Sequence, residues 1–186
     1  MKLLIMGPPG VGKGTQADCI NNELKIVHLS TGEILRAEVD AKSVIGRNAK
    51  LYMDFGRLAP DNILIEIVTE RISKSDCQNG YILDGFPRTL PQAKGLDEMM
   101  HSIGHDLDCA ISLTANKDEL LDRLIKRGED DGRSDDNPDV IRNRQKIYWE
   151  QTAPLLDFYH EKGILKEVDG LGEIPEITKR ILDVLK

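Results

Sequence analysis

The sequence lacks a long apolar run. A membrane-spanning helix needs about 20 consecutive apolar residues, and no stretch of the 186 residues approaches that length. The apolar start, Leu3 to Met6, meets Gly7-Pro8-Pro9 too soon to form the hydrophobic region of a secretory signal. We therefore expect no membrane association and a cytoplasmic location.

Closely spaced cysteines are also missing. Cys19, Cys77 and Cys109 are odd in number and far apart, which argues against a disulfide framework and against a zinc site of the Cys-x-x-Cys type. We expect them to be small buried apolar residues. The four histidines match no metal-ligand spacing and no catalytic base motif, so we expect structural or surface roles for all of them, His28 included.

Excess positive charge is absent as well. The net charge of −7 argues against a general nucleic-acid-binding protein, which is usually basic. It does not exclude nucleotides, because a nucleotide needs only a local cluster of cations. An apolar fraction of 40% in 186 residues is enough for the core of one compact domain.

Short apolar runs alternate with helical patterns along the chain. We predict strands at 2–6, 26–29, 81–83, 109–113 and 165–168. Because helices separate them, this alternation predicts an α/β fold, a parallel sheet of about five strands with helices on both faces. Helix start signals include Ser30 with Glu33, and Asn137-Pro138-Asp139.

Two stretches fit the alternation poorly and are candidate inserts over the carboxyl ends of the strands. One is helical without a strand of its own, and the other is rich in Gly and Asp. We predict a single domain with a core at 1–29, 60–127 and 137–186, a first insert at 30–59 and a short second insert at 128–136.

The strongest motif runs from Gly7 to Thr15, directly after the first strand and before a helix. Its glycines let backbone N–H groups point inward, and the following helix adds its positive end, so the loop is suited to phosphates. Lys13 would bridge the β- and γ-phosphates of a nucleoside triphosphate. Gly14 stands where Ser or Thr usually binds Mg²⁺, and Thr15 follows, so we expect Mg²⁺ to be held mainly by phosphate oxygens and water.

A second motif, Asp84-Gly85-Phe86-Pro87-Arg88, follows the buried run 81–83. An acid at the end of such a strand can hold Mg²⁺ through water, and Arg88 can bind a phosphate with its two-pronged guanidinium.

Together with Leu29-Ser30-Thr31-Gly32 and Arg36, these two motifs resemble the adenylate kinase family, and the match runs through nearly the whole chain in the correct order. The resemblance implies a P-loop fold with a nucleoside-monophosphate insert at 30–59 and a lid at 128–136. It implies reversible phosphoryl transfer from ATP with Mg²⁺ to AMP, giving two ADP, by a monomer. The lid is of the short type and lacks the four cysteines of zinc-bearing lids, so no zinc is expected.

The resemblance also implies an AMP site in which Arg36 and Arg88 contact the nucleotide and Gln92 reads the adenine edge. Arg57 and Ala59 depart from the Lys and Val that members often carry. The implied AMP-binding residues are Thr31, Gly32, Arg36, Met53, Arg57, Leu58, Ala59, Gly85, Phe86, Pro87, Arg88, Gln92, Arg133 and Arg144.

On the ATP side the resemblance implies the phosphate loop, an arginine pair and the backbone of Gly172 near the base. The implied ATP-binding residues are Gly10, Val11, Gly12, Lys13, Gly14, Thr15, Arg123, Arg127 and Gly172. Arg123 and Arg127 are four apart and share one helix face. The implied catalytic residues are Lys13, Asp84, Arg88, Arg123, Arg127, Arg133 and Arg144.

Residues outside these motifs receive ordinary roles. We expect Arg47, Arg71 and Arg180 to be solvated surface charges, and Trp149 to lie in the core. Two other functions remain open: a UMP/CMP kinase of the same architecture, and a non-catalytic nucleotide switch. Thr31, Thr89 and Gln92 favour adenine over the pyrimidines. A switch would not need an acceptor-site Arg88 together with the helix pair Arg123 and Arg127.

Overall fold

The computed structural model describes residues 1–131 and 137–186. In these residues, five parallel strands form one sheet in the order β2-β3-β1-β4-β5. The strands are β1 (Lys2–Met6), β2 (Val27–Ser30), β3 (Tyr81–Asp84), β4 (Cys109–Thr114) and β5 (Leu165–Asp169). All five predicted strands are confirmed, with bounds that differ by at most one residue, and so is the predicted fold class.

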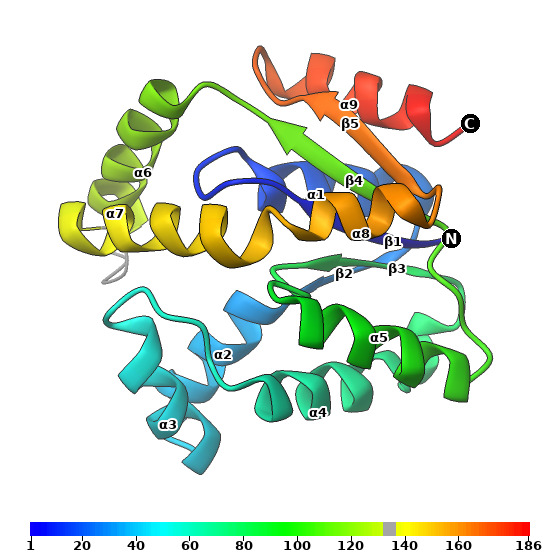
Figure 1. Ribbon diagram of the computed structural model, residues 1–186, viewed down its shortest axis with the longest axis horizontal. Coiled ribbons are helices and arrows are strands. Elements are labelled where there is room, and N and C mark those ends of the chain that lie inside the picture. The colour runs from blue at the N-terminus through cyan, green and yellow to red at the C-terminus, as the bar shows by residue number, and fades with distance from the viewer. Residues whose placement is uncertain (132–136) are drawn as a thin grey trace.

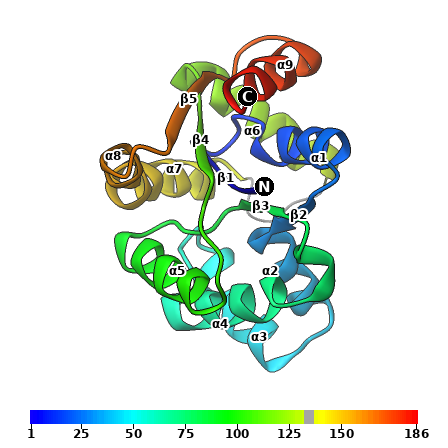
Figure 2. The same cartoon turned by 90° about the vertical axis from the view of Figure 1, so that its right-hand side faces the viewer.

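Alternate side chains of β1 enter two different apolar clusters, one on each face of the sheet. Leu3 and Ile5 pack with α1 (Lys13–Leu24) and α9 (Ile174–Val184). Leu4 and Met6 point the other way, into the larger cluster. Most of its helical residues come from α4 (Asp61–Ile72), α5 (Leu90–Ser102) and α8 (Leu155–Glu161). Figure 2 shows α1 and α9 on one side of the sheet and α5 and α8 on the other.

Local capping explains where several helices begin. Ser30 Oγ accepts a hydrogen bond from the Glu33 N–H at the start of α2 (Thr31–Asp40), as the sequence predicts. Asn137 caps α7 (Pro138–Ile147) in the same way, through the Val140 N–H. The other helical elements are α3 (Val44–Met53), α6 (Lys117–Asp131) and the short 3₁₀ turn η1 (Ser75–Cys77).

The predicted first insert is formed by α2, α3 and the segment that leads to α4. Figure 1 shows α2 and α3 standing away from the sheet, below the end of α7. Leu35, Ala49 and Ala59 attach the insert to the larger apolar cluster. On the other side, α6 continues to Asp131, so the first residues of the predicted lid belong to a helix. Residues 132–136 of that lid, including Arg133, lie outside the described residues.

A π turn, η3 (Tyr148–Thr152), joins α7 to α8. The Ala153 N–H donates to the carbonyl five residues earlier, on Tyr148, at 2.8 Å. Tyr148 and Thr152 are buried, whereas Trp149 is 46% exposed. The prediction that Trp149 lies in the core is therefore wrong, because the π turn directs its neighbour Tyr148 inward instead. None of the helices in the described part of the chain is long and apolar enough to cross a membrane.

Candidate functional site

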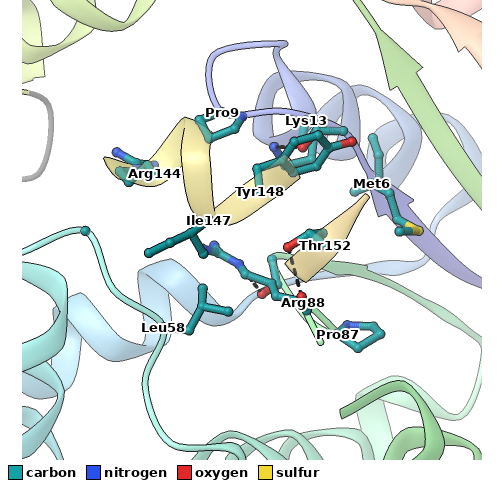
Figure 3. Close-up of a pocket in the computed structure, with 14 residues that line it drawn as sticks. Met6, Pro9, Lys13, Leu58, Pro87, Arg88, Arg144, Ile147, Tyr148 and Thr152 are labelled. Atoms are coloured by element: carbon teal, nitrogen blue, oxygen red, sulfur yellow. Dashed lines mark hydrogen bonds between the residues drawn. The ribbon is translucent and has the colours of Figure 1, made fainter. Parts of the chain in front are cut away.

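The site lies where β1 and β3 end, between the Gly7–Thr15 loop, the first insert and α7. Three adjacent hollows of about 510, 60 and 70 Å³ meet there, and Gly85, Arg88 and Arg144 line all three of them. The carboxyl ends of parallel strands are the usual place for ligands in such sheets. Figure 3 shows Arg88 and Arg144 around the smallest of the three hollows, with Lys13 on its far wall.

The largest hollow follows the phosphate-binding loop. All of the predicted loop residues from Gly10 to Thr15 line it. Gly10 and Gly12 have φ values of +88° and +96°, in the left-handed region that favours glycine, and this backbone shape is what curves the loop. Gly12 directly precedes α1, so the positive end of that helix faces the hollow. Lys13 donates from Nζ to the carbonyls of Gly7 and Pro8, at 2.8 and 3.0 Å.

The charge of Lys13 depends on its surroundings. Burial lowers its pKa to about 8, and the positive charges of Arg88, Arg144 and Arg127 act in the same direction, whereas Asp84 opposes them. Without an anion, Lys13 therefore holds its proton less firmly than an exposed lysine does. The negative charge of a bound polyphosphate would favour the charged form of Lys13.

Asp84 ends β3 beside the loop. Its carboxylate is almost fully buried, and a Cβ placed on Gly14 would lie 3.7 Å from Oδ2. Burial raises the pKa of Asp84, but the contact with His28 and the charges of Lys13 and Arg88 outweigh it, so the net shift is downward and the carboxylate is ionised at neutral pH. His28 lies on β2, the strand next to β3, with Nε2 3.5 Å from Asp84 Oδ2. No motif in the sequence indicates that His28 takes part in the site.

The turn after Asp84 presents Arg88. The Phe86–Pro87 peptide bond is cis, and Gly85 has a φ of +81°. A Cβ on Gly85 would lie 2.9 Å from Thr31 Oγ1 and 3.0 Å from Arg88 Nη2, so only glycine lets these two side chains meet. Arg88 donates from Nε to the Gly85 carbonyl at 2.8 Å. Thr31 and Arg88, both predicted to contact AMP, thus lie on either side of Gly85.

The third hollow lies between the first insert, the Arg88 turn and α7. Of the predicted AMP-binding residues, it is lined by Thr31, Gly32, Arg36, Met53, Arg57, Leu58, Ala59, Gly85, Arg88 and Arg144. Pro87 lines the smallest hollow instead. Gly56 has a φ of +62°, and a Cβ there would lie 2.9 Å from Arg144 Cγ and from Val140 Cγ1. The insert and α7 are therefore in close contact.

Phe86 and Gln92, also predicted for AMP, line none of these hollows and are fully buried. The Gln92 amide is engaged at both ends. Nε2 donates to Asp61 Oδ1 at 2.6 Å, and Oε1 accepts from the Arg88 N–H at 2.7 Å. In this structure Gln92 therefore holds the backbone of the Arg88 turn and does not line a hollow.

The helix arginines approach from the opposite side. Arg123 and Arg127, four residues apart on α6, both line the largest hollow, and Arg144 on α7 joins them. Arg123 Nη2 also donates to Glu119 Oε1 at 2.5 Å, one turn earlier on α6. Four of the predicted cations, together with Lys13, thus surround one space: Arg88, Arg123, Arg127 and Arg144.

All three arginines expected to be solvated surface charges have definite partners. Arg47 Nη1 donates to the Lys42 carbonyl at 2.6 Å. Arg180 Nη1 donates to the Leu171 carbonyl at 2.6 Å and to the Asp169 carbonyl at 3.1 Å, which holds the loop that carries Gly172. Gly172, which is predicted to approach the ATP base, lines the largest hollow. Arg71 forms a two-pronged pair with Asp76, at 2.8 and 2.7 Å. No sequence pattern indicates these partners of the arginines, because each contact depends on the path of the backbone in the fold.

Known proteins match this chain over most of its length. The family model described as adenylate kinase matches residues 5–164. A protein named adenylate kinase from Nocardioides sp. (strain ATCC BAA-499 / JS614) is 48% identical over 185 residues, which is 100% of this chain and 97% of that protein. Another of that name, from Leptospira biflexa, is 49% identical over 97% of each chain, and one from Stenotrophomonas maltophilia (strain R551-3) is 45% identical over the full length of both. With a matched family model over most of its length and relatives this similar over all of it, the chain belongs to the adenylate kinase family of phosphotransferases.

Proposed function

We propose that this protein transfers the terminal phosphoryl group of ATP to AMP, reversibly, giving two ADP. The observation that carries the proposal is the shared wall of the three hollows. Arg88 and Arg144 line both the hollow along the phosphate loop and the hollow beside the first insert. A donor in the first and an acceptor in the second would meet at these two guanidinium groups.

The chemistry requires charge stabilisation more than proton transfer. The second pKa of a phosphate monoester is near 6, so the acceptor is already mostly dianionic at neutral pH. Two unit charges about 4 Å apart interact by roughly 4 kcal/mol at an effective dielectric of 20. Fixed cations at Lys13, Arg88 and Arg144 offset this repulsion between the two nucleotides and stabilise the charge on the transferring group. We assign Arg123 and Arg127 to the same task from α6, and Arg133 by family resemblance alone.

The residues present fit a magnesium ion carried by ATP. Asp84 offers a buried, ionised carboxylate beside the first turn of α1, and Thr15 offers a hydroxyl at the same hollow. A nucleotide-bound Mg²⁺ would be held there by phosphate oxygens and by water that Asp84 orients. When bound, the ion supplies additional positive charge to the phosphate oxygens.

Adenine as the acceptor base is supported by residues around the third hollow. Thr31 reaches the Arg88 turn, where its Oγ1 donates to the Asp84 carbonyl at 3.3 Å. The Gln92 amide keeps one N–H and one acceptor lone pair beyond the two hydrogen bonds already described. We assign these to the adenine edge when the insert moves outward to admit AMP. Uracil presents the reverse order, a carbonyl acceptor beside an N–H donor, so these hydrogen bonds select against UMP, whereas cytosine shares the adenine pattern and is tested directly below.

Water must be excluded, or ATP would be hydrolysed. We propose that the first insert, 30–59, and the short lid, 128–136, close over the nucleotides, that their opening limits turnover, and that the protein acts as a cytoplasmic monomer. Slow chemistry with fast ADP release in presteady-state experiments would contradict the proposed rate-limiting step.

The direct test measures ADP formation from ATP and Mg²⁺ with AMP, UMP, CMP and GMP in parallel. We expect AMP to be the preferred acceptor. Equal or higher kcat/KM with UMP or CMP would overturn the acceptor assignment, and no transfer to any of the four would overturn the function. Arg88→Ala should lower kcat/KM for AMP by roughly 10²- to 10³-fold while the protein stays folded.

A further inference from the structure

Thr152 belongs to none of the motifs that indicate function, yet its side chain reaches the Arg88 turn. Its hydroxyl donates to the Arg88 carbonyl at 2.9 Å, across 64 positions of sequence. Thr152 is buried and lines the hollow drawn in Figure 3, where this hydrogen bond is visible beside Arg88.

The backbone of Arg88 is held on both of its polar groups. Its carbonyl accepts from Thr152, and its N–H donates to Gln92 Oε1 at 2.7 Å. Gln92 is itself fixed, because Asp61 Oδ1 accepts from its Nε2 at 2.6 Å. A carboxylate can only accept and an N–H can only donate, so these two partners determine which way round the Gln92 amide lies.

The π turn explains how Thr152 comes to face Arg88. A hydrogen bond that spans five residues places one extra residue in the helical turn, and such turns are frequent at functional sites. Here the turn from Tyr148 to Thr152 directs both of these side chains inward, after α7 has brought Arg144 to the same hollow. Arg144 and Thr152 thus lie on one continuous helical stretch, and Thr152 connects that stretch to the Arg88 carbonyl.

We propose that Thr152 is a positioning residue for the reaction: its hydroxyl fixes the backbone of Arg88 so that the guanidinium group meets the acceptor phosphate together with Arg144. This inference rests on the proposed function, in which Arg88 binds that phosphate. An arginine side chain has many rotamers, so the point where its chain begins must be fixed if its end is to be placed accurately. Small errors in such placement are costly for transfer between two bound groups.

Two substitutions separate positioning from packing. Thr152→Val keeps the shape and removes the donor, whereas Thr152→Ser keeps the donor and removes a methyl group. If Thr152 only fills space, Ser should be the more damaging change, since it leaves a small cavity. If the hydroxyl positions Arg88, Val should be the more damaging change for activity.

The kinetic experiment measures kcat and both KM values for the two variants, with Thr69→Val as control. The Thr69 hydroxyl donates to the Ile65 carbonyl within α4 and to Met99 Sδ on α5, so the control makes the same exchange of hydroxyl for methyl at residues that line none of the three hollows. We expect Thr152→Val to lower kcat/KM for AMP by roughly tenfold, with KM for ATP changed by less than about twofold. We expect Thr152→Ser and Thr69→Val to stay within about threefold of the unsubstituted protein. Equal activity of Val and Ser, or a larger loss with Ser, would overturn the proposal.

A second readout does not depend on the reaction. The Nε–H of Arg88 donates to the Gly85 carbonyl, so its ¹H–¹⁵N resonance in the free protein reports how well this arginine is placed. Thr152→Val should shift or broaden that resonance, and Thr152→Ser should not. An unchanged resonance in Thr152→Val would contradict the positioning role even if activity fell. If the unsubstituted protein fails to phosphorylate AMP while the resonance responds as expected, the proposed function fails and the positioning of Arg88 by Thr152 stands.

Discussion

The imidazole Nε2 of His28 lies 3.5 Å from Oδ2 of Asp84, and its Nδ1 lies 2.8 Å from Oδ1 of Asp18. A ring with a carboxylate at each nitrogen is best satisfied when both nitrogens carry protons. Burial of the ring lowers the pKa of His28, but the two carboxylates outweigh burial and the net shift is upward. His28, on the neighbouring strand β2, therefore adds a positive charge beside Asp84.

The charge of His28 should stabilise the fold over a defined pH range. A pKa raised above the ordinary 6.5 means that the stabilisation is fully present below pH 6.5 and is lost as the pH rises through the raised value. The lowered pKa of Asp84 acts in the opposite sense, so its contribution is lost as the pH falls below about 3.8. We expect His28→Gln to reduce the free energy of unfolding by about 1 kcal/mol between these limits.

The measurement is denaturant unfolding of both proteins from pH 4 to pH 9, with the exposed His101→Gln as control. The difference between His28→Gln and the unsubstituted protein should shrink as the pH rises above 6.5. A difference that grows with pH in this range would show that the ring is neutral in the folded protein and would contradict the predicted stabilisation.

Lys13 should take up a proton when ATP binds. Its pKa of about 8 in the free protein leaves it about half protonated at pH 8, and a bound polyphosphate favours the charged form. Calorimetric titration with an uncleavable ATP analogue at pH 8, in buffers of different ionisation enthalpy, should therefore show uptake of about half a proton. The uptake should be smaller at pH 6.5, where Lys13 is already charged, and affinity should fall as the pH rises past 8. Binding without proton uptake at pH 8 would mean that Lys13 is charged before the nucleotide arrives.

The sequence predicts the parts of this protein that depend on local patterns. Strands β1, β3 and β4 follow from nearly continuous apolar runs, and the phosphate loop follows from glycines placed between a strand and a helix. Ser30 and Asn137 cap their helices because the capping bond joins residues only three apart. The hollows bring together Lys13, Arg88 and Arg144 because all three lie near the carboxyl ends of the parallel strands or on the helix above them.

Contacts between distant segments are what the sequence does not predict. Thr152 and Arg180 bind backbone carbonyls, which leave no residue-type signal at the acceptor position. His28 acquires its role from the register of β2 against β3, which sets His28 opposite Ile82, two residues before Asp84. The prediction for Trp149 is wrong because the sequence does not show which of two adjacent aromatic residues, Tyr148 or Trp149, a π turn directs inward.

Contact between Gly56 and α7 should be needed for AMP binding. Gly56→Ala places a Cβ 2.9 Å from both Arg144 Cγ and Val140 Cγ1, so the insert must shift away from α7 and separate Leu58 and Arg36 from Arg144. We expect KM for AMP to rise roughly tenfold or more, with little change in KM for ATP. The hydrogen bond from Asn143 Nδ2 to the Phe55 carbonyl, 2.6 Å long, supports the same contact.

Gly104→Ala is a matched control for Gly56→Ala. Gly104 has a similar φ of +69°, but a Cβ there would meet nothing within 4 Å. Both substitutions should cost about 1–2 kcal/mol from left-handed backbone strain, whereas only Gly56→Ala should affect AMP. If Gly56→Ala lowers KM for AMP, the contact with α7 blocks the site rather than completing it.

Substitution of Arg180 should weaken the binding of ATP, the donor nucleotide, and leave the binding of AMP unchanged. Its guanidinium holds the carbonyls of Asp169 and Leu171, and the adjoining Gly170 packs against the phosphate loop, where a Cβ would lie 2.9 Å from Val11 Cγ2. The loop that carries Gly172 is thus held to α9 on one side and to the triphosphate hollow on the other. Arg180→Gln should loosen this loop and raise KM for ATP by roughly threefold to tenfold, with KM for AMP unchanged.

Lys179→Gln removes the same charge from the neighbouring position of α9, where the ammonium pairs with Asp183 at the surface, and should leave both KM values unchanged. Equal effects of the two substitutions would mean that overall charge, rather than the held loop, sets ATP affinity. A rise in KM for AMP with Arg180→Gln would mean that this loop also acts on the acceptor side of the site.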